Sequence, residues 1–524
     1  MTIARAVLTI FAFSLVSLAS AAPNPIVRAA DSPELLLDRA AVAEKAGEWD
    51  RALESYLRVY LAGRQTPEIR RKIATCQRHS AQARRHRDPV FRQHVLSLPT
   101  ADALNLYSEV LEKLSSLHAD REAATPAKLF LSGLEEFDRA LANRTFRAEH
   151  LAGVPDATVA RFRRTISEFW KSKPPTTVRE SRTAALELAR SAGTDLGVKA
   201  GSAVVLELLC GACNGLDEYT VYLSPLHGGG AATGIAELAT YGIAASFRNG
   251  ALTVDRIVPE SWAAENPVLK TGDRIARING RRVTDAVTLT ESLRFPSDGE
   301  HEFDIATDFS MMALPARIPS PLPTVQASIP NMKDGVGFIK LTGFHEQTPL
   351  ELDAALARLK EQGIRSLVLD LRGNTGGQFL AGVRVAERFI PSGILAATEG
   401  QAPEFAGRIF SSDSGMLAFD LPMAVLIDTR TMSAAEVVAS ALKDQQRAVV
   451  IGMPTFGKGV VQHPFKIGAA DGVHKFRSGT LVLTIAKILT ARGAALHGHG
   501  VIPDLVEADP ARQLALALER LVPR

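Results

Sequence analysis

Ser433 and Lys458 are the two side chains whose types and spacing most readily combine into a reaction. Ser433 lies 25 residues before Lys458, and Gln462 follows four residues after the lysine. A serine hydroxyl becomes a nucleophile when a base takes its proton, and a neutral lysine amine can be that base. Upstream lies the glycine-rich run Asp370–Gly377, whose glycines free the backbone to approach a substrate carbonyl closely. The pattern favours acyl transfer by a Ser–Lys pair.

The neighbours of Lys458 predict that its amine is neutral. Phe456, Val460 and Val461 are apolar, and burial among such side chains lowers the pKa of a lysine. If Lys458 and Gln462 belong to one strand, they share a face of it, because side chains alternate along a strand. Gln462 is therefore expected to orient the amine.

Ser433 has a purely structural interpretation as well. Ser433–Glu436 reads S-A-A-E, a capping box that begins a helix. Taken alone, the motif predicts only a helix start. A nucleophile there would still benefit, because helix N-terminal amides stabilise developing negative charge.

Lys458 also has a rival interpretation as part of a phosphate-binding loop. Gly452–Lys458 fits G-x-x-x-x-G-K, but Gly459 stands where that loop needs Ser or Thr to hold magnesium. A helix should follow the loop, whereas Val460–Pro464 reads as a strand ended by its proline. Nucleotide binding is not favoured, and no cofactor or metal is expected.

Alternating strands and helices surround these residues and predict an α/β core with helices on a mixed sheet. The predicted strands are 336–341, 366–371, 424–428 and 448–451, and the predicted helices are 350–362 and 434–444. The whole core is expected over residues 331–511, followed by a C-terminal helix at 512–524.

Residues 232–310 show strand-like alternation and resemble a PDZ domain. Asn279-Gly280 is a strong hairpin-turn signal. In the resemblance, Tyr241, Gly242, Ile243 and Ala244 occupy the loop that binds a peptide's C-terminal carboxylate, and the peptide adds as a strand to the sheet edge. A proline-rich linker is predicted at 311–330.

The N-terminal third reads as helical up to about residue 223. Ala40–Tyr56 resembles one tetratricopeptide-type hairpin, with its turn at Gly47. A TPR-like arm is expected at 31–170 and a helical segment leading into the core at 176–228. The arm is interpreted equally well as a surface for a regulatory partner or as a structural shoulder.

Residues 1–21 look like a signal peptide. Arg5, the apolar run Ala6–Leu18 and Ala19–Ala21 supply the three expected regions. The apolar run is too short for a stable membrane anchor. We therefore expect an exported protein of the periplasm or cell envelope.

Composition excludes several classes. The 524 residues carry 60 basic and 57 acidic side chains, a balance that argues against nucleic-acid binding. The basic cluster near residue 85 is interpreted as a solvated helix face (Arg78, Arg84, Arg85 and Arg87). Cys210 and Cys213 form a C-x-x-C within an apolar helical stretch, and helix packing is favoured over redox or zinc chemistry.

Residues 190–505 resemble the carboxyl-terminal processing peptidases, exported tail-specific proteases with a Ser–Lys pair. The matching stretches occur in family order: 216–223, the PDZ region, 368–377, 433–436, 455–462 and 498–504. The resemblance implies a crotonase-like, ClpP-like β-α spiral core and therefore a multidomain α+β protein. Thr375 replaces the family's usual proline, and Ala435 replaces a common serine.

The family resemblance also assigns roles to site residues. Ser433 is the implied nucleophile, Lys458 the general base and then acid, and Gln462 the residue that orients the lysine. Ala434 and Gly376 are the implied oxyanion donors. The expected activity is that of a serine endopeptidase that recognises apolar C-terminal tails of proteins or peptides.

Two other function classes are weighed against the peptidase. A non-catalytic PDZ and helical-repeat adaptor would fit a chain that had lost one of Ser433, Lys458 or Gln462, and all three are present. A crotonase-like acyl-CoA enzyme is suggested only by the relation between folds, and the export signal argues against it.

Overall fold

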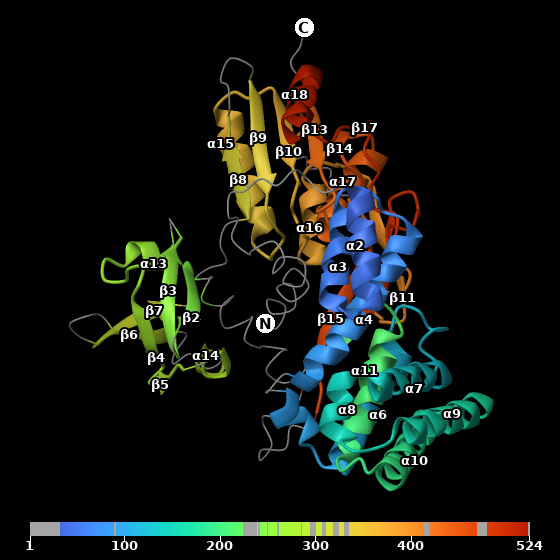
Figure 1. Ribbon diagram of the computed structural model, residues 1–524. Helices are drawn as coiled ribbons and strands as arrows, with labels where there is room; N and C mark the ends of the chain where they lie inside the picture. Colours follow the sequence, from blue (N-terminus) through green and yellow to red (C-terminus); the bar gives the residue numbers. More distant parts are fainter. Residues whose placement is uncertain are drawn as a thin grey trace.

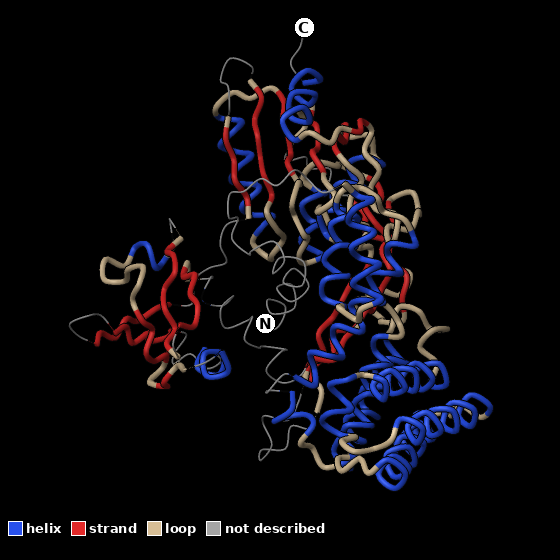
Figure 2. Tube along the Cα trace, viewed as in Figure 1, coloured by secondary structure: helices blue, strands red, loops and turns tan. Residues whose placement is uncertain are grey.

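The computed structural model describes residues 32–87, 91–223, 238, 241–248, 250–258, 261–284, 286–293, 300–306, 311–317, 324–329, 335–412, 419–468 and 479–521. The predicted signal peptide lies outside these residues. The chain is a multidomain α+β protein, with helices first, an antiparallel sheet next and a mixed α/β part last (Figures 1 and 2). None of the described helices has the length and apolar character needed to span a bilayer.

The first third of the chain is helical, as predicted. Prolines begin several of its helices, where the missing N–H costs nothing. Gly47, at φ +72°, makes the predicted turn between the first two helices. The elements are α2 (Pro33–Lys45), α3 (Trp49–Leu61), α4 (Pro67–Arg87), η1 (Arg92–Leu96), α6 (Thr100–Leu117), α7 (Pro126–Ala142), α8 (Arg144–His150), α9 (Asp156–Ser172), α10 (Val178–Leu196) and α11 (Gly201–Asn214).

Helices α7 and α11 pack closely through glycines. A methyl group on Gly211 would lie 2.7 Å from the Cα atom of Gly133, so only glycine permits this approach. Cys210 and Cys213 on α11 are buried free thiols, and burial raises the pKa of Cys210 to about 12. The packing interpretation of the C-x-x-C is thus confirmed.

A six-stranded sheet forms the centre of the last part of the chain. Its order is β17-β14-β13-β10-β9-β8, and all neighbours are parallel except β8 with β9. The strands are β8 (Val325–Ser328), β9 (Val336–Leu341), β10 (Ser366–Asp370), β13 (Met423–Ile427), β14 (Val449–Gly452) and β17 (Leu505–Val506). The predicted strands of the α/β core are confirmed to within one or two residues.

Helices cover both faces of this sheet. Leu367 and Leu369 of β10 belong to the main core, whereas Val368 between them packs in a smaller cluster with Ala517. This alternation is what a strand buried on both faces requires. The helices are α15 (Thr348–Glu361), α16 (Phe379–Glu387), α17 (Ala434–Asp444) and, on the smaller cluster's side, α18 (Pro510–Leu521).

A second, antiparallel sheet packs into the same main core. Its long strand β16 (Thr480–Thr490) pairs with β1 (Val221–Leu223), β11 (Gly393–Gly400) and β15 (Val460–Lys466), and β11 pairs with β12 (Arg408–Ser412). Residues 221–223 were predicted to be helical, which is wrong, because pairing with β16 overrides the local pattern. The predicted end of a strand at Pro464 is also wrong. Among the described strands β15 pairs with β16 alone, so it lies at an edge, where the missing N–H is tolerated.

The third sheet has a core of its own. It comprises β2 (Ile243–Arg248), β3 (Ala251–Ile257), β4 (Arg274–Ile278), β5 (Arg281–Arg282), β6 (Glu300–Ala306) and β7 (Met311–Arg317), with helices α13 (Trp262–Glu265) and α14 (Ala286–Leu293). Asn279 and Gly280 both have positive φ, as their hairpin turn needs. Its buried residues form a cluster separate from the main core, and the sheet lies apart from the other two (Figure 1).

The predicted linker at 311–330 is wrong at both ends. Residues 311–317 are strand β7, in which Pro315 lies opposite Glu302 on an edge, and residues 325–328 are strand β8 of the central sheet. Proline composition suggested a linker, but edge strands also accept proline.

The interpretation of the basic cluster as a solvated face is wrong for Arg85. Its side chain is 12% exposed and bonds the buried carboxylates Glu136 and Glu207. Arg84, in contrast, is exposed.

Candidate active site

Ser433 lies in a strained turn between β13 and α17. Its φ of +54° and ψ of −119° are unusual for a residue with a side chain. The preceding residues are held by the segment that follows β10, because the Met432 N–H donates to Asn374 O at 2.9 Å and Thr431 Oγ1 donates to Leu371 O at 3.0 Å. Ser433 itself is half-buried, so the turn presents its hydroxyl at a partly open place.

The glycine loop after β10 lies directly against this turn. A methyl group on Gly376, at φ +96°, would lie 2.8 Å from Ser433 Cβ and 3.1 Å from Ala434 N. Ala434 is the first residue of α17, where the N–H has no intrahelical acceptor. The Gly376 N–H, however, donates to Asn374 Oδ1 at 2.9 Å. To serve as an oxyanion donor it would have to exchange that bond for the substrate's oxygen.

Glu436 joins two segments of the site. One is the turn at residues 428–433, called the serine turn, and the other is the loop at residues 453–459, called the lysine loop. Glu436 Oε2 accepts the Ser433 N–H at 2.7 Å and the Lys458 N–H at 2.8 Å. Its Oε1 accepts the Gly457 N–H at 2.6 Å and the Thr455 hydroxyl at 2.5 Å. Burial raises the pKa of this carboxyl to about 7, although the four donors oppose the rise. The sequence pattern assigned Glu436 only a capping role, and its position three residues after Ser433 was the one available signal.

Lys458 has the environment predicted for a base. Lys458 is half-buried, and the surrounding protein removes water from its amine. This desolvation lowers the pKa of Lys458 to about 8, against the opposing influence of Glu436, Asp217 and Glu218. Its Nζ lies 5.2 Å from the centroid of the Tyr219 ring.

Gln462 does not share a strand face with Lys458, so that reasoning was wrong. β15 begins at Val460, after the lysine, and its register shifts between Val461 and Gln462. Instead, Gln462 Nε2 donates to the carbonyl oxygen of Tyr219 at 2.9 Å. Tyr219 therefore contacts both residues.

The loop that carries Tyr219 is held by Asp217. Its Oδ1 accepts the N–H groups of Tyr219 and Thr220, at 2.7 and 2.5 Å, and its Oδ2 lies 2.9 Å from His118 Nε2. Sequence reasoning did not select Tyr219 as a site residue. The signal was present in the stretch 216–223, which matched the family but was given no role.

The predicted carboxylate loop lies at an edge of the third sheet. Ile243 and Ala244 begin β2, whose described partner is β3 alone. Tyr241 is buried against Trp262 and Phe303. The loop lies in a different unit from Ser433 and Lys458.

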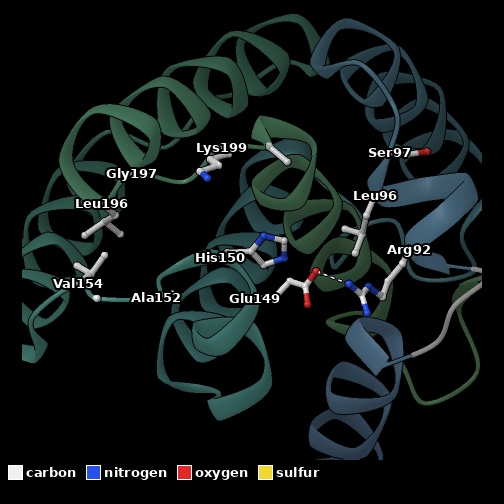
Figure 3. A pocket seen from close by; sticks show the side chains of 12 residues that line it. Arg92, Leu96, Ser97, Glu149, His150, Ala152, Val154, Leu196, Gly197 and Lys199 are labelled. Carbon is white, nitrogen blue, oxygen red and sulfur yellow. Dashed lines mark hydrogen bonds and ion pairs between the residues drawn. The ribbon is translucent and has the colours of Figure 1, made fainter.

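A cavity of about 850 Å³ lies elsewhere, among the N-terminal helices (Figure 3). Arg92 of η1 and Glu149 of α8 form an ion pair at 2.6 Å along its wall, near His150. None of the predicted site residues lines it. Within the described residues, no group of three or more His, Cys, Asp or Glu side chains could hold a metal ion.

Comparison with known proteins matches residues 335–507 to the family described as peptidase family S41. The carboxyl-terminal-processing protease of Synechocystis sp. is 31% identical over 258 residues, which cover 47% of this chain and 57% of that protein. The carboxy-terminal-processing protease of Bartonella bacilliformis is 30% identical over 281 residues, 52% of this chain and 62% of that protein. The matches thus span little more than half the length of these relatives.

A solved structure, the photosystem II D1 C-terminal processing protease, aligns over 80% of this chain and 97% of its own. It is 21% identical, with a TM-score of 0.39. The matched residues 335–507 contain the Ser433 turn, Glu436 and the Lys458 loop. Over these residues, about a third of its length, the chain is similar to peptidase family S41.

Proposed function

We propose that the protein is a serine endopeptidase in which Ser433 is the nucleophile and Lys458 the general base. The observation that carries this proposal is the buried Glu436 carboxylate, which binds the backbone of both residues and so fixes the serine turn against the lysine loop. A lysine whose pKa is about 8 is partly neutral near neutral pH. It can then accept a proton from a hydroxyl.

The reaction follows from these positions. The Ser433 hydroxyl loses its proton to the Lys458 amine and attacks the scissile carbonyl, and the N–H groups of Ala434 and Gly376 bind the oxyanion. Lys458 returns the proton to the leaving amine as the peptide bond breaks. The neutral Lys458 amine then takes a proton from water, whose oxygen attacks the acyl-enzyme. Lys458 returns this proton to Ser433 Oγ as the ester bond breaks, which frees the serine. Gln462 supports the lysine through Tyr219, which contacts both.

Substrate selection is proposed to use the third sheet as a PDZ domain. β2 is an edge strand that begins at the predicted carboxylate loop, so an extended peptide can add beside it. The loop Tyr241–Ala244 would hold the terminal carboxylate. The substrates would then be proteins or peptides with apolar C-terminal tails. The matched relatives are named as proteases that process carboxyl termini.

Export to the periplasm or cell envelope is part of the proposal. It is supported by the signal-like residues 1–21. The hairpin α2–α3 is proposed to be TPR-like and to bind a regulatory partner. No specific observation favours the adaptor alternative, since the serine, lysine and glutamine are all retained.

Incubation of the purified protein lacking residues 1–21 with β-casein tests the function. Matched Ser433→Ala and Lys458→Ala proteins serve as controls. Cleavage by the wild type alone supports the Ser–Lys peptidase. Equal cleavage by the Ser433→Ala protein would sink the assignment.

A further inference from the structure

The hairpin formed by helices α3 and α4 reaches the loop that carries Lys458. Phe456, two residues before the lysine, packs into a small apolar cluster of the hairpin together with Val59, Tyr60 and Ile69. Its ring lies 5.1 Å from the Tyr60 ring in an edge-to-face arrangement. The loop is therefore packed on helices α3 and α4, which lie almost 400 residues earlier in the chain.

Two side chains of the hairpin bind the same carbonyl of this loop. Tyr60 Oη donates to Phe456 O at 2.6 Å, and Arg70 Nη2 donates to it at 2.7 Å. The Arg70 guanidinium also lies over the Tyr60 ring, 4.9 Å from its centroid. Hydrogen bonds from a charged guanidinium are among the stronger ones in proteins.

The peptide group whose carbonyl these residues bind also contacts Glu436, through its own N–H at Gly457. The Phe456 N–H donates to Thr431 O at 3.0 Å, and the next two N–H groups, of Gly457 and Lys458, donate to Glu436. A methyl group on Gly457 would lie 2.7 Å from Arg70 Nη2, so Arg70 is packed tightly against the loop. The serine turn also contacts the hairpin, because Thr429 Oγ1 donates to Leu61 O at 2.7 Å.

Helix α4 is fixed at its other end as well. Gln82, Arg85 and His86, more than two turns beyond Arg70, bond the buried Glu207 of α11 at 2.8 to 3.1 Å. With 21 residues, α4 is about 30 Å long. It spans from the helical body to the lysine loop as one rigid element.

From these contacts we propose that Arg70 and Tyr60 are positioning residues of the active site and that the hairpin completes the scaffold that holds Lys458. This proposal rests on the proposed function for its effect on catalysis. The structural part of the proposal is that the hairpin fixes residues 455–458. This part does not depend on catalysis. Misplacing a base by about 1 Å through a distant change can cost about 100-fold in rate.

The test compares Arg70→Met, Tyr60→Phe and Arg70→Lys with Arg64→Met as the matched control. Arg64 belongs to the same hairpin but forms an exposed ion pair with Glu34. Tyr60→Phe keeps the ring packing and removes only the hydroxyl. Two readouts are used, amide hydrogen exchange of residues 455–462 and steady-state cleavage of a peptide substrate, with thermal unfolding as a check on folding.

In Arg70→Met, exchange of the Gly457 and Lys458 amides is expected to rise at least about tenfold, because their hydrogen bonds open more often. The kcat is expected to fall about 10- to 100-fold with little change in KM. Tyr60→Phe is expected to show smaller changes, Arg70→Lys a partial recovery of both readouts, and Arg64→Met the wild-type values.

The proposal would be overturned if amide hydrogen exchange at residues 455–458 were unchanged in both Arg70→Met and Tyr60→Phe. It would also be overturned if Arg64→Met changed amide exchange and kcat as much as Arg70→Met does. If the wild type cleaves nothing, the proposed function fails. The exchange result still decides whether the hairpin holds the loop.

Discussion

At the scale of single residues, Ser433 combines a strained backbone conformation with a half-buried position that solvent can still reach in part. A φ of +54° is a conformation that glycine adopts at little cost and that residues with a side chain rarely adopt. Such strain is commonly found where function requires a side chain in one place.

The strain predicts different stabilities for two inactive proteins. Ser433→Gly relieves the positive φ, whereas Ser433→Ala keeps it, so the glycine variant should have the larger free energy of unfolding by about 1 kcal/mol. Urea unfolding of the two proteins measures the difference. A glycine variant no more stable than the alanine variant would show that the turn is not strained.

The lowered pKa of Lys458 predicts a dependence on pH. Since the base must be neutral, kcat/KM should rise about tenfold per pH unit below pH 8 and level off above it. Initial rates between about pH 6 and 9.5 measure this. A Lys458→Arg protein, charged throughout, should stay inactive at every pH, and a wild-type profile that is flat across pH 8 would contradict the role of the lysine.

The same group affects stability in a defined direction. Between pH 8 and the ordinary lysine pKa, the unfolded chain holds the proton and the folded protein does not. Stability should therefore rise with pH through this window as far as Lys458 contributes.

At the scale of elements, α4 depends on a buried ionic cluster. Arg85 and His86 of α4 bond Glu207, and Arg85 also bonds Glu136 of α7. Burial would raise the pKa of Glu207, but Arg85, His86 and Gln82 outweigh it and lower this pKa to about 2. Removing Glu207 takes a carboxylate partner from Arg85 and from His86 inside the protein, and such a loss is strongly destabilising.

Glu207→Ala should therefore reduce the free energy of unfolding by about 3–5 kcal/mol. Glu135→Ala, an exposed position on α7, serves as the control and should change it by less than about 0.5 kcal/mol. Chemical denaturation of both proteins provides the measurement. A Glu207→Ala protein as stable as the control would mean that the cluster does not anchor α4.

At the scale of the whole molecule, the described residues form one main core and a second core in the third sheet. Helices α6 to α11 share one continuous core with the central sheet and with β16. The predicted division into an arm at 31–170 and a segment at 176–228 does not correspond to separate cores. Helices α2–α4 and the third sheet have clusters of their own, and a smaller cluster lies between the central sheet and α18.

Two separate cores predict two unfolding transitions. Phe303→Ala empties a fully buried site in the third sheet and should destabilise only that unit, by about 3–5 kcal/mol. Phe389→Ala is the matched change in the main core and should lower only the other transition. Scanning calorimetry distinguishes them, and a single transition that both variants shift equally would refute the division.

Local patterns in the sequence determined the elements and pointed to the candidate site residues. Strand β9 and helix α17 have the bounds predicted for them, because apolar runs, turn glycines and helix starts depend on neighbours in the chain. The same local signals placed Ser433 at a helix start and Lys458 among apolar residues.

The tertiary structure alone decided how those residues are held. Glu436 accepts hydrogen bonds from the serine turn and from the lysine loop. Gln462 donates to Tyr219, which is 243 positions away in the chain, and Arg70 donates to Phe456, which is 386 positions away. Pairing with β16 likewise decided that 221–223 is a strand and that β15 continues through Pro464. Hydrogen bonds and strand pairings between distant segments depend on the packed arrangement of the whole chain, which leaves no periodicity or spacing in the sequence to predict them.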